Sequence, residues 1–461
     1  MLKNVFIKTF GCQMNERDSE ILSQVLLDHG YHENGDMDSA DLVILNTCTI
    51  RAKAEQKVMS LLGALRKCKE RKPDMKICVA GCVAQQEGER LLQRMPHVDV
   101  VMGTQNIYEI DYLIDKVNAT GKPVVATDMS RDFRIPAFLP QAHPTPAKEK
   151  YPTRSFKRFV TIMQGCDNYC AYCVVPYTRG REISRNPEDI IEEIRVLADQ
   201  GIKEITLLGQ NVNSYGMQSQ DTPLPCSFPQ LLHRIAAIQG LRRLRFTTSH
   251  PKDLSDELIS CFGDIKILCP QFHLPVQSGS DAILQRMNRK YTVARYLERV
   301  EKLWQIRPDL ALTTDMIIGF PGETDADFAL TMDLLERARF HGSFSFKYSD
   351  RPGVRSAGFS GKIPEKVKTE RLALYQKRQD EISLERNRAY VDTLQELMVE
   401  SADDNGFQGR TGTNHIVHVE GRTELRPGEF AVVKIIHAGQ HSLKGKLHPQ
   451  GELRVIKNLF L

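Results

Sequence analysis

Short apolar runs alternate with longer amphipathic segments over residues 1 to about 120. The runs VFIKTF, DLVILN and KICVAG have the length and the branched, apolar composition of buried strands. Between them, apolar positions recur at helical spacing over residues 19–29 and 52–67. Strands that alternate with helices are typical of a parallel α/β sheet, so we predict an N-terminal domain of this kind over residues 1–126.

A proline-rich segment interrupts this alternation. Residues 127–154 contain five prolines and scattered charges without sustained periodicity, which is typical of an extended linker. We expect the linker over residues 127–151 and a second domain over residues 152–383. The apolar runs of that domain are FVTIMQG, IKEITLLGQ, LRRLRFTTS, QFHLPVQ, ALTTDMIIGF and GSFSFKYSD. Repeated βα units predict a partial parallel (β/α) barrel with its site in the loops after the strands.

The last part of the chain changes character again. A charged helical stretch from Pro364 to about Asp392 leads into short strands such as HIVHVEG and EFAVVKIIHAG, which predict a small antiparallel β-barrel over residues 384–461. Residues 405–461 contain eight Lys and Arg against four Asp and Glu, although the whole chain has a net charge of only +4. An RNA-binding appendage and a solvated β-domain with incidental basic residues explain this composition equally well.

Composition excludes several classes of protein. Hydrophobic residues at 41% and charged residues at 26% are ordinary for a globular protein and indicate neither disorder nor a fibre. No apolar run reaches the length of a membrane span, and the first residues lack the apolar centre of a signal peptide. We therefore expect a cytoplasmic protein. Eleven cysteines in such a chain argue against a disulfide framework and favour metal binding or catalysis where they cluster.

The strongest chemical signal is the CxxxCxxC run of Cys166, Cys170 and Cys173, which directly follows a predicted strand. Three thiolates in one loop can hold three irons of a [4Fe-4S] cluster and leave the fourth open to a small molecule. A structural zinc site is the alternative, but zinc prefers four closed ligands and no partner pair lies nearby. The spacing resembles the signature of the radical S-adenosylmethionine (SAM) superfamily, whose members bind SAM at the open iron.

A second triplet is spread over the N-terminal domain. Cys12, Cys48 and Cys82 each lie just beyond the carboxyl end of a predicted strand. Parallel strands place those ends along one edge of the sheet, so the three thiols can converge and hold a second cluster. The remaining cysteines have no recognisable spacing and are interpreted as ordinary buried thiols: Cys68, Cys78, Cys226, Cys261 and Cys269.

With two triplets and a basic barrel in this order, the chain resembles the methylthiotransferase family of radical SAM enzymes over nearly all of its length. The runs VVPYTRGRE, LLGQNVNSYG, FTTSHP, HLPVQSGSDAILQRMNR and DMIIGFPGET are similar to the branch that modifies tRNA already carrying an isopentenyl group. The resemblance implies a C-terminal TRAM domain that binds RNA. It also implies addition of a methylthio group to carbon 2 of N(6)-isopentenyladenosine at position 37, in the anticodon stem-loop of tRNA.

The resemblance assigns a role to each triplet. The cluster at Cys166, Cys170 and Cys173 would pass an electron to SAM and so generate a 5′-deoxyadenosyl radical, while the cluster at Cys12, Cys48 and Cys82 would carry the added sulfur. A second SAM would methylate that sulfur. We therefore expect two [4Fe-4S] clusters, two SAM per product and a monomeric enzyme with a reducing partner such as flavodoxin or ferredoxin.

Weaker candidates lie at the ends of the predicted barrel strands. Those for contacts with SAM or adenosine are Tyr172, Gly209, Gln210, Gln277, Ser278, Gly279 and Asp315. Gln210 stands in LGQN where the superfamily often has a Gly-Gly-Glu run, so it replaces that carboxylate only as a neutral hydrogen-bond partner. A structural role explains Gln277, Ser278, Gly279 and Asp315 as readily.

A glycine turn and three arginines complete the candidates. The turn over residues 319–324 has a backbone suited to close approach by a cofactor, although it is not a phosphate loop. Arg179, Arg181 and Arg185 follow the cysteine loop and are candidates for binding tRNA phosphates or a SAM carboxylate. A solvated basic loop is the alternative for all three.

Two other functions share parts of this pattern. A methylthiotransferase that acts on threonylcarbamoyladenosine in tRNA, or on an aspartate of a ribosomal protein, would have the same two triplets. A non-catalytic iron–sulfur protein that binds RNA would have clusters for structure or redox sensing, but three cysteines at each site argue against it.

Overall fold

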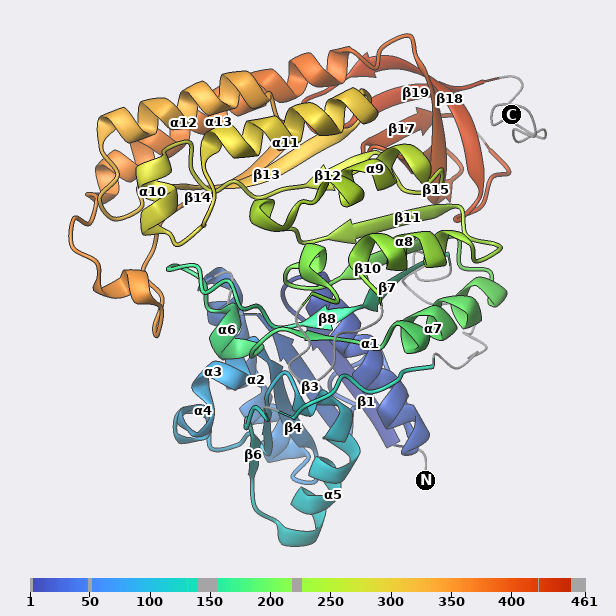
Figure 1. Ribbon diagram of the computed structural model, residues 1–461. Coiled ribbons are helices and arrows are strands. Elements are labelled where there is room, and N and C mark those ends of the chain that lie inside the picture. The colour runs from blue at the N-terminus through green and yellow to red at the C-terminus, as the bar shows by residue number, and fades with distance from the viewer. Residues whose placement is uncertain are drawn as a thin grey trace.

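The computed structural model describes residues 3–48, 52–130, 132–139, 156–217, 226–421 and 423–448. Figure 1 shows three units: an N-terminal sheet with its helices, a central open barrel, and a small C-terminal barrel at the far end of the central one. In the described residues, no helix combines the length and the apolar character needed to cross a bilayer.

The N-terminal unit is a six-stranded parallel sheet of order β2-β1-β3-β4-β5-β6. Its strands are β1 (Lys3–Thr9), β2 (Tyr31–Glu33), β3 (Leu42–Thr47), β4 (Lys76–Gly81), β5 (Val100–Met102) and β6 (Val124–Ala126). Its helices are α1 (Gln13–Asp28), α2 (Ala52–Arg71), α3 (Cys82–Glu87), α4 (Glu89–Arg94), η1 (Asn106–Glu109) and α5 (Ile110–Thr120). Apolar side chains from both faces of the central strands are buried, which explains why these strands are apolar at nearly every position.

Helix α1 begins earlier than the sequence pattern predicts. The expected start is Ser19, but the helix begins at Gln13, immediately after Cys12. Its first turns contain the polar residues Asn15, Arg17 and Asp18, which look like a loop in the sequence. All three side chains are buried in polar contacts, so tertiary packing outweighs their local preference.

The central unit is an open parallel barrel of six strands. They form two three-stranded sheets, of order β11-β10-β7 and β12-β13-β14, joined by the bridge between Leu244 and Leu268. The strands are β7 (Lys157–Thr161), β10 (Glu204–Leu208), β11 (Arg243–Thr247), β12 (Gln271–His273), β13 (Ala311–Ile318) and β14 (Gly342–Lys347). This unit contains the helices α7 (Pro187–Asp199), α8 (Phe228–Ala236), α9 (Asp256–Asp264), α11 (Val293–Ile306) and α12 (Asp325–Ala338). Two short helices lie near its loops, α6 (Val175–Thr178) and α10 (Asp281–Arg286). A small hairpin, β8 (Met163–Gln164) with β9 (Ile183–Ser184), frames the cysteine loop.

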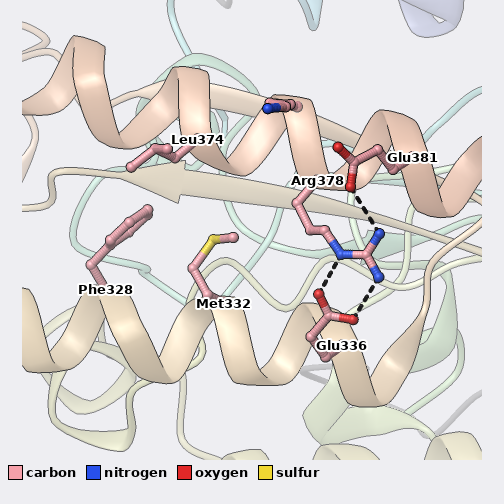
Figure 2. Close-up of a pocket in the computed structure, with 7 residues that line it drawn as sticks. Phe328, Met332, Glu336, Leu374, Arg378 and Glu381 are labelled. Atoms are coloured by element: carbon pink, nitrogen blue, oxygen red, sulfur yellow. Dashed lines mark hydrogen bonds and ion pairs between the residues drawn. The ribbon is translucent and has the colours of Figure 1, made fainter.

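A long helix, α13 (Glu365–Arg388), runs beside α12 and leads to the C-terminal barrel. Figure 2 shows the shallow pocket between these two helices, where the guanidinium of Arg378 forms a fork on the carboxylate of Glu336. Phe328, Met332 and Leu374 line the same pocket. Because α13 crosses residue 383, the predicted boundary between the second and third domains falls inside a helix.

The C-terminal unit is a closed barrel of order β15-β16-β17-β19-β18. Its strands are β15 (Leu394–Asp403), β16 (Gly406–Thr411), β17 (Ile416–Glu420), β18 (Phe430–Ala438) and β19 (Leu443–Leu447). The predicted small barrel is confirmed, although β17 and β19 pair in parallel rather than antiparallel. That pair closes the ring and leaves no exposed strand edge.

The other two units contact different parts of the central barrel. Arg243 and Arg245, near the amino ends of the barrel strands, donate to backbone carbonyls of the C-terminal unit at 2.7–3.0 Å. At the carboxyl ends, Arg17 of α1 and Arg185 share the buried carboxylate of Glu193 on α7. The N-terminal sheet therefore meets the barrel at the end where sites of this fold are found.

Candidate active site with two cysteine triplets

The N-terminal triplet, here called the auxiliary cysteines (Cys12, Cys48 and Cys82), lies at one edge of the N-terminal sheet. Each residue follows one of three neighbouring strands, β1, β3 and β4. The three thiols lie close enough for Cys48 to change the acidity of both Cys12 and Cys82. The parallel topology thus brings together thiols that are 36 and 34 residues apart in the sequence.

Glycine permits this close approach. Gly81 precedes Cys82 with a φ of +90°, and a Cβ there would lie 2.5 Å from Oδ1 of Asn46 and 2.6 Å from the carbonyl oxygen of Thr47. A side chain at this position would therefore clash with the neighbouring strand end. In the sequence, the sign of this packing is the glycine that directly precedes Cys82.

A buried amide pair supports the auxiliary cysteines, and the sequence gives little sign of it. The thiol of Cys12 donates to Oδ1 of Asn15 at 3.3 Å. The side chain of Asn15 donates to Oδ1 of Asn46 at 2.8 Å, and the side chain of Asn46 donates back to the carbonyl oxygen of Asn15 at 2.8 Å. These bonds fix the first turn of α1 to the end of β3 and so orient Cys12.

The auxiliary thiols differ in acidity. The hydrogen bond from Cys48 lowers the pKa of Cys12 to about 6 and that of Cys82 to about 7, and the positive charge of Arg179 acts in the same direction on both. The same hydrogen bonds raise the pKa of Cys48. Thiolates are the form that binds metals, so this site is electrostatically prepared for cations.

Arg179 is not a surface phosphate ligand, contrary to one of the expectations for the three arginines. Its side chain is buried, and its Nη2 atom is 2.7 Å from Oδ2 of Asp18 on α1. Arg185 is likewise buried against Glu193. Only Arg181 is exposed, with Nη2 3.4 Å from Oδ2 of Asp167.

The second triplet, here called the barrel-loop cysteines (Cys166, Cys170 and Cys173), follows β8 at the carboxyl end of the barrel. Each thiol has a polar neighbour, and the neighbour of Cys170 comes from a distant part of the chain. Nδ2 of Asn168 is 3.4 Å from Sγ of Cys166, Nη1 of Arg289 is 3.4 Å from Sγ of Cys170, and the backbone N–H of Val175 is 3.5 Å from Sγ of Cys173.

Arg289 is a functional candidate that sequence reasoning missed. Its side chain is buried, and it also contacts the Tyr172 hydroxyl at 3.4 Å and the carbonyl oxygen of Pro275 at 2.6 Å. Arg289 thus links Tyr172 to Cys170, and a contact of Tyr172 with SAM stays a prediction. Arg289 ends the run HLPVQSGSDAILQRMNR, which carries the family resemblance, but nothing in that run marks it as a neighbour of the cysteines.

Burial keeps two barrel-loop thiols in their neutral form. Burial raises the pKa of Cys166 to about 11 and that of Cys173 to about 12. A metal that binds here must therefore displace protons, and its binding strengthens as pH rises.

Buried polar atoms without partners gather at the carboxyl ends of β10 and β11 and in the hairpin near β8. Such atoms are costly unless a ligand or water satisfies them. In the described residues they include Oε1 of Glu182, Oδ1 of Asn211, Oδ1 of Asn213, Oγ of Ser249 and Nε2 of His250. Burial also raises the pKa of Glu182 to about 7. The cradle fits a polar, amino- and hydroxyl-bearing molecule such as SAM.

The strand-end residues predicted from sequence have mixed surroundings. Gly209 packs so tightly on Met163 that a Cβ would lie 2.4 Å from its Cγ atom, and Oε1 of Gln210 accepts from the backbone N–H of Gly165 at 2.5 Å. Gln210 therefore supports the residue that precedes Cys166. Oδ1 of Asp315 is 3.4 Å from Nε2 of His273 on the neighbouring strand.

The remaining residues predicted from sequence form hydrogen bonds within the protein. The backbone of Gln277 bridges to β13 through Asp315 and Ile317 at 3.0 Å each, and Ser278 accepts from the N–H of Ser280 at 3.2 Å. The N–H of Gly279 donates to Oγ1 of Thr331 at 3.0 Å.

The polar groups of the glycine turn over residues 319–324 bond to one another and to α13. The N–H of Gly319 donates to the carboxylate of Glu323, which pairs with Arg371 of α13 at 2.7 Å. These contacts support a structural role for the turn.

Each triplet offers the donor set that a [4Fe-4S] cluster needs. In the part of the chain that the structure describes, no three Cys, His, Asp or Glu side chains are arranged to hold one metal ion. In a [4Fe-4S] cluster each cysteine binds a different iron, so its ligands need not converge on a point. All eleven cysteines are free thiols, and each triplet offers three donors.

Comparison with known proteins defines the class of the barrel. Residues 160–335 match the Radical SAM superfamily, and residues 4–103 match Uncharacterized protein family UPF0004. Among solved structures, the radical SAM methyltransferase TsrM from Kitasatospora setae covers 77% of this chain and 74% of its own, with a TM-score of 0.57 and 15% identity. The cobalamin-dependent radical enzyme OxsB covers 82% of this chain and 56% of its own, with a TM-score of 0.51 and 13% identity. The central unit is therefore a radical SAM fold.

Full-length relatives define the family. The tRNA-2-methylthio-N(6)-dimethylallyladenosine synthase of Desulfotalea psychrophila is 56% identical and covers 96% of this chain and 99% of its own. The relative of that name in Geobacter sulfurreducens is 47% identical and covers 96% of this chain and 97% of its own. This chain belongs to the tRNA-2-methylthio-N(6)-dimethylallyladenosine synthase family.

Proposed function

We propose that this protein adds a methylthio group to carbon 2 of N(6)-isopentenyladenosine at position 37 of tRNA and consumes two SAM per product. The observation that carries the proposal is the placement of two cysteine triplets on either side of one interface. The auxiliary cysteines lie at the sheet edge that meets the carboxyl end of the barrel, and the barrel-loop cysteines lie at that end.

Two [4Fe-4S] clusters and SAM serve this reaction. In our proposal, the barrel-loop cysteines hold the cluster that binds SAM, and the auxiliary cysteines hold the other. When bound, the first cluster and SAM supply a radical that abstracts hydrogen, the second cluster carries the sulfur, and a further SAM supplies the methyl group.

The partnerless polar atoms near the barrel-loop cysteines are the proposed SAM cradle. Glu182 offers a buried carboxylate oxygen without a partner, and its charge acts on Cys166. A carboxylate is the natural acceptor for the amino group of SAM. Binding of the positive amino group would ionise Glu182, whose pKa burial raises to about 7, and so supply the charge that Gln210 lacks. Asn213 and Ser249 are suited to hold polar groups of the nucleoside.

The inner face of β14 suits the isopentenyl group. On one face of β14, Ser343 and Ser345 form hydrogen bonds with Tyr375 and Gln376 of α13. Side chains alternate along a strand, so Phe344 and Phe346 lie on the other face, toward the inside of the open barrel. Both phenylalanines are exposed there. An isopentenyl chain needs an apolar surface of this kind. Register places Phe344 beside Asp315 of β13.

The protein acts on tRNA, and the basic C-terminal barrel is the proposed grip on its phosphates. The target base must leave its stack to expose carbon 2 to the barrel. A flavodoxin or ferredoxin as electron donor, a monomeric state and a cytoplasmic location, where tRNA is found, complete the proposal.

A nucleoside assay tests the proposed function. The full chain with reconstituted clusters is incubated anaerobically with SAM, a strong reductant and tRNA from cells that lack it, and the digested nucleosides are analysed by mass spectrometry. We expect methylthio-isopentenyladenosine, and a Cys166→Ala variant should form none. Release of 5′-deoxyadenosine without any methylthio nucleoside would overturn the assigned substrate.

A further inference from the structure

Arg179 has an unusual position between the two cysteine triplets. Its side chain is 3% exposed, and its Nη2 atom is paired with Asp18. Its Nη1 atom is buried and has no partner in the described residues. A buried guanidinium N–H without an acceptor costs free energy, which points to a ligand that accepts a hydrogen bond from it.

The backbone around Arg179 is tied to both triplets. Arg179 follows α6, which begins two residues after Cys173, and the N–H of Cys166 donates to the carbonyl oxygen of Gly180 at 3.2 Å. On the other side, Oγ1 of Thr104 in the N-terminal unit donates to the carbonyl oxygen of Thr178 at 2.7 Å. The position of Arg179 is therefore fixed relative to both sites.

Geometry places Arg179 beside the two helices that begin at auxiliary cysteines. Asp18, which holds the Arg179 guanidinium, lies on α1, and α1 begins directly after Cys12. The helix α6, which ends just before Arg179, packs against α3, and α3 begins at Cys82. Three thiolates and an added sulfur ligand would accumulate negative charge in this buried place. Arg179 is the cation placed to compensate it, and Asp18 holds its guanidinium in position.

We propose that Arg179 is the electrostatic partner of the auxiliary site, where its guanidinium stabilises the thiolates and its free Nη1–H donates to the anionic sulfur ligand. Because Arg179 comes from the barrel loop, the unit that binds SAM also supplies this charge. The inference rests on the proposed function for the identity of the sulfur ligand, but its electrostatic part does not require tRNA or SAM.

The test isolates the auxiliary cluster in the full chain. Replacement of Cys166, Cys170 and Cys173 by alanine removes the other cluster, and the midpoint potential of the remaining one is measured by a redox titration followed by electron paramagnetic resonance. In this background, Arg179→Gln is compared with Arg179→Lys and with Asp18→Asn. Iron content per chain and the melting temperature verify that each variant is loaded and folded.

Loss of the Arg179 charge and loss of the Asp18 charge should shift the midpoint potential in opposite directions. Reduction adds negative charge, so loss of the cation should lower the potential by about 59 mV or more, a tenfold change in the one-electron equilibrium. Loss of the Asp18 charge should raise it, and Arg179→Lys should restore most of the potential. A purely structural role would not produce shifts of opposite sign, and unchanged potentials in Arg179→Gln and Asp18→Asn would overturn the proposal.

A binding measurement tests the second part of the proposal. Sodium sulfide is titrated into the same proteins and the spectrum of the auxiliary cluster is followed. We expect sulfide to bind at least tenfold more weakly to Arg179→Gln than to the parent. Equal affinity would overturn the role of Nη1–H. Neither measurement depends on product formation, so failure of the proposed tRNA reaction would be seen separately.

Discussion

Arg289 and Arg179 show how a single buried guanidinium serves each cysteine site. Arg289 contacts Cys170, and Arg179 acts on Cys12 and Cys82. A guanidinium keeps its charge in a buried site. Each cysteine triplet thus has a permanent cation beside it.

Gly81 provides a test of packing at the auxiliary site. Gly81→Ala places a Cβ within 2.6 Å of two atoms at a φ of +90°, so we expect a loss of about 1–3 kcal/mol in the free energy of unfolding and lower iron content. Chemical denaturation and iron analysis measure both. Gly63→Ala in α2 is the matched control, because a Cβ there meets nothing within 4 Å; it should stabilise by about 0.5–1 kcal/mol. Similar effects of the two changes would contradict this account.

The sequence predicts the cysteines better than their neighbours. Cys12, Cys48 and Cys82 stand at strand ends, and strand ends of a parallel sheet share an edge, so their convergence follows from topology. Their role as ligands stays a prediction. The burial of Arg179 depends on the docking of two units, and no local pattern in the sequence encodes it.

At the scale of elements, a buried ion network fastens α1 to α7. Glu193 is fully buried and accepts from both Arg17 and Arg185. Such a network positions elements because each charge is costly without its partners. The start of α1 shows the same effect: its polar residues are buried by contacts that lie far away in sequence.

Removal of the shared carboxylate should weaken the packing of α1 against α7. Glu193→Gln leaves Arg185 without its counter-charge and leaves Arg17 with Glu20 alone, so we expect a loss of about 3–5 kcal/mol in the free energy of unfolding. The control is Glu192→Gln on the exposed side of α7, where the pair with Arg195 is solvated and the change should stay within about 0.5 kcal/mol. Urea denaturation measures both, and equal stabilities would refute the role of the network.

Two histidines make the contact between the central and C-terminal units sensitive to acid. His341 and His415 have ring centroids 6.0 Å apart. Burial lowers their pKa values to about 3 and about 4, with help from the positive charges of Arg386 and Arg410 respectively. Both imidazoles are therefore neutral in the folded protein.

Acidification should weaken the fold through these residues. The unfolded chain binds protons near the ordinary histidine pKa of about 6.5, whereas the folded chain does so only near pH 3–4. Their contribution is present above pH 6.5 and is lost as pH falls below it, by about 1–2 kcal/mol per histidine at pH 5. Urea denaturation at pH 7.5 and 5.0 checks this, and the double variant His341→Gln/His415→Gln should lose less stability on acidification than the parent.

At the scale of the whole molecule, the central barrel contacts the other units at two places. The C-terminal barrel lies at the amino ends of its strands, and the N-terminal unit lies along the β7 side, next to the cysteine loop (Figure 1). The order of the three units could be predicted from the alternation of strands and helices. Their docking could not, because it depends on contacts such as Arg243 with the carbonyl oxygen of Arg410.

The C-terminal barrel presents lysines that should bind tRNA phosphates. Lys434 and Lys446 are exposed and lie opposite each other on β18 and β19. Replacing both by Gln should weaken tRNA binding and reduce the slope of log affinity against log salt by about 1–2. Filter binding at several salt concentrations measures this slope. The pair Lys366→Gln/Lys377→Gln on α13 removes the same charge and should leave the slope unchanged; an equal decrease would place the tRNA elsewhere.

The separation of roles between the two triplets is the central claim, and one reaction tests it most directly. A variant with Cys12, Cys48 and Cys82 replaced by alanine is incubated with SAM, reductant and isopentenylated tRNA. Both 5′-deoxyadenosine and the methylthio nucleoside are then quantified in the same sample. We predict that SAM cleavage continues while the methylthio nucleoside is absent. Loss of both products in a folded protein that retains the barrel-loop cluster would contradict separate roles.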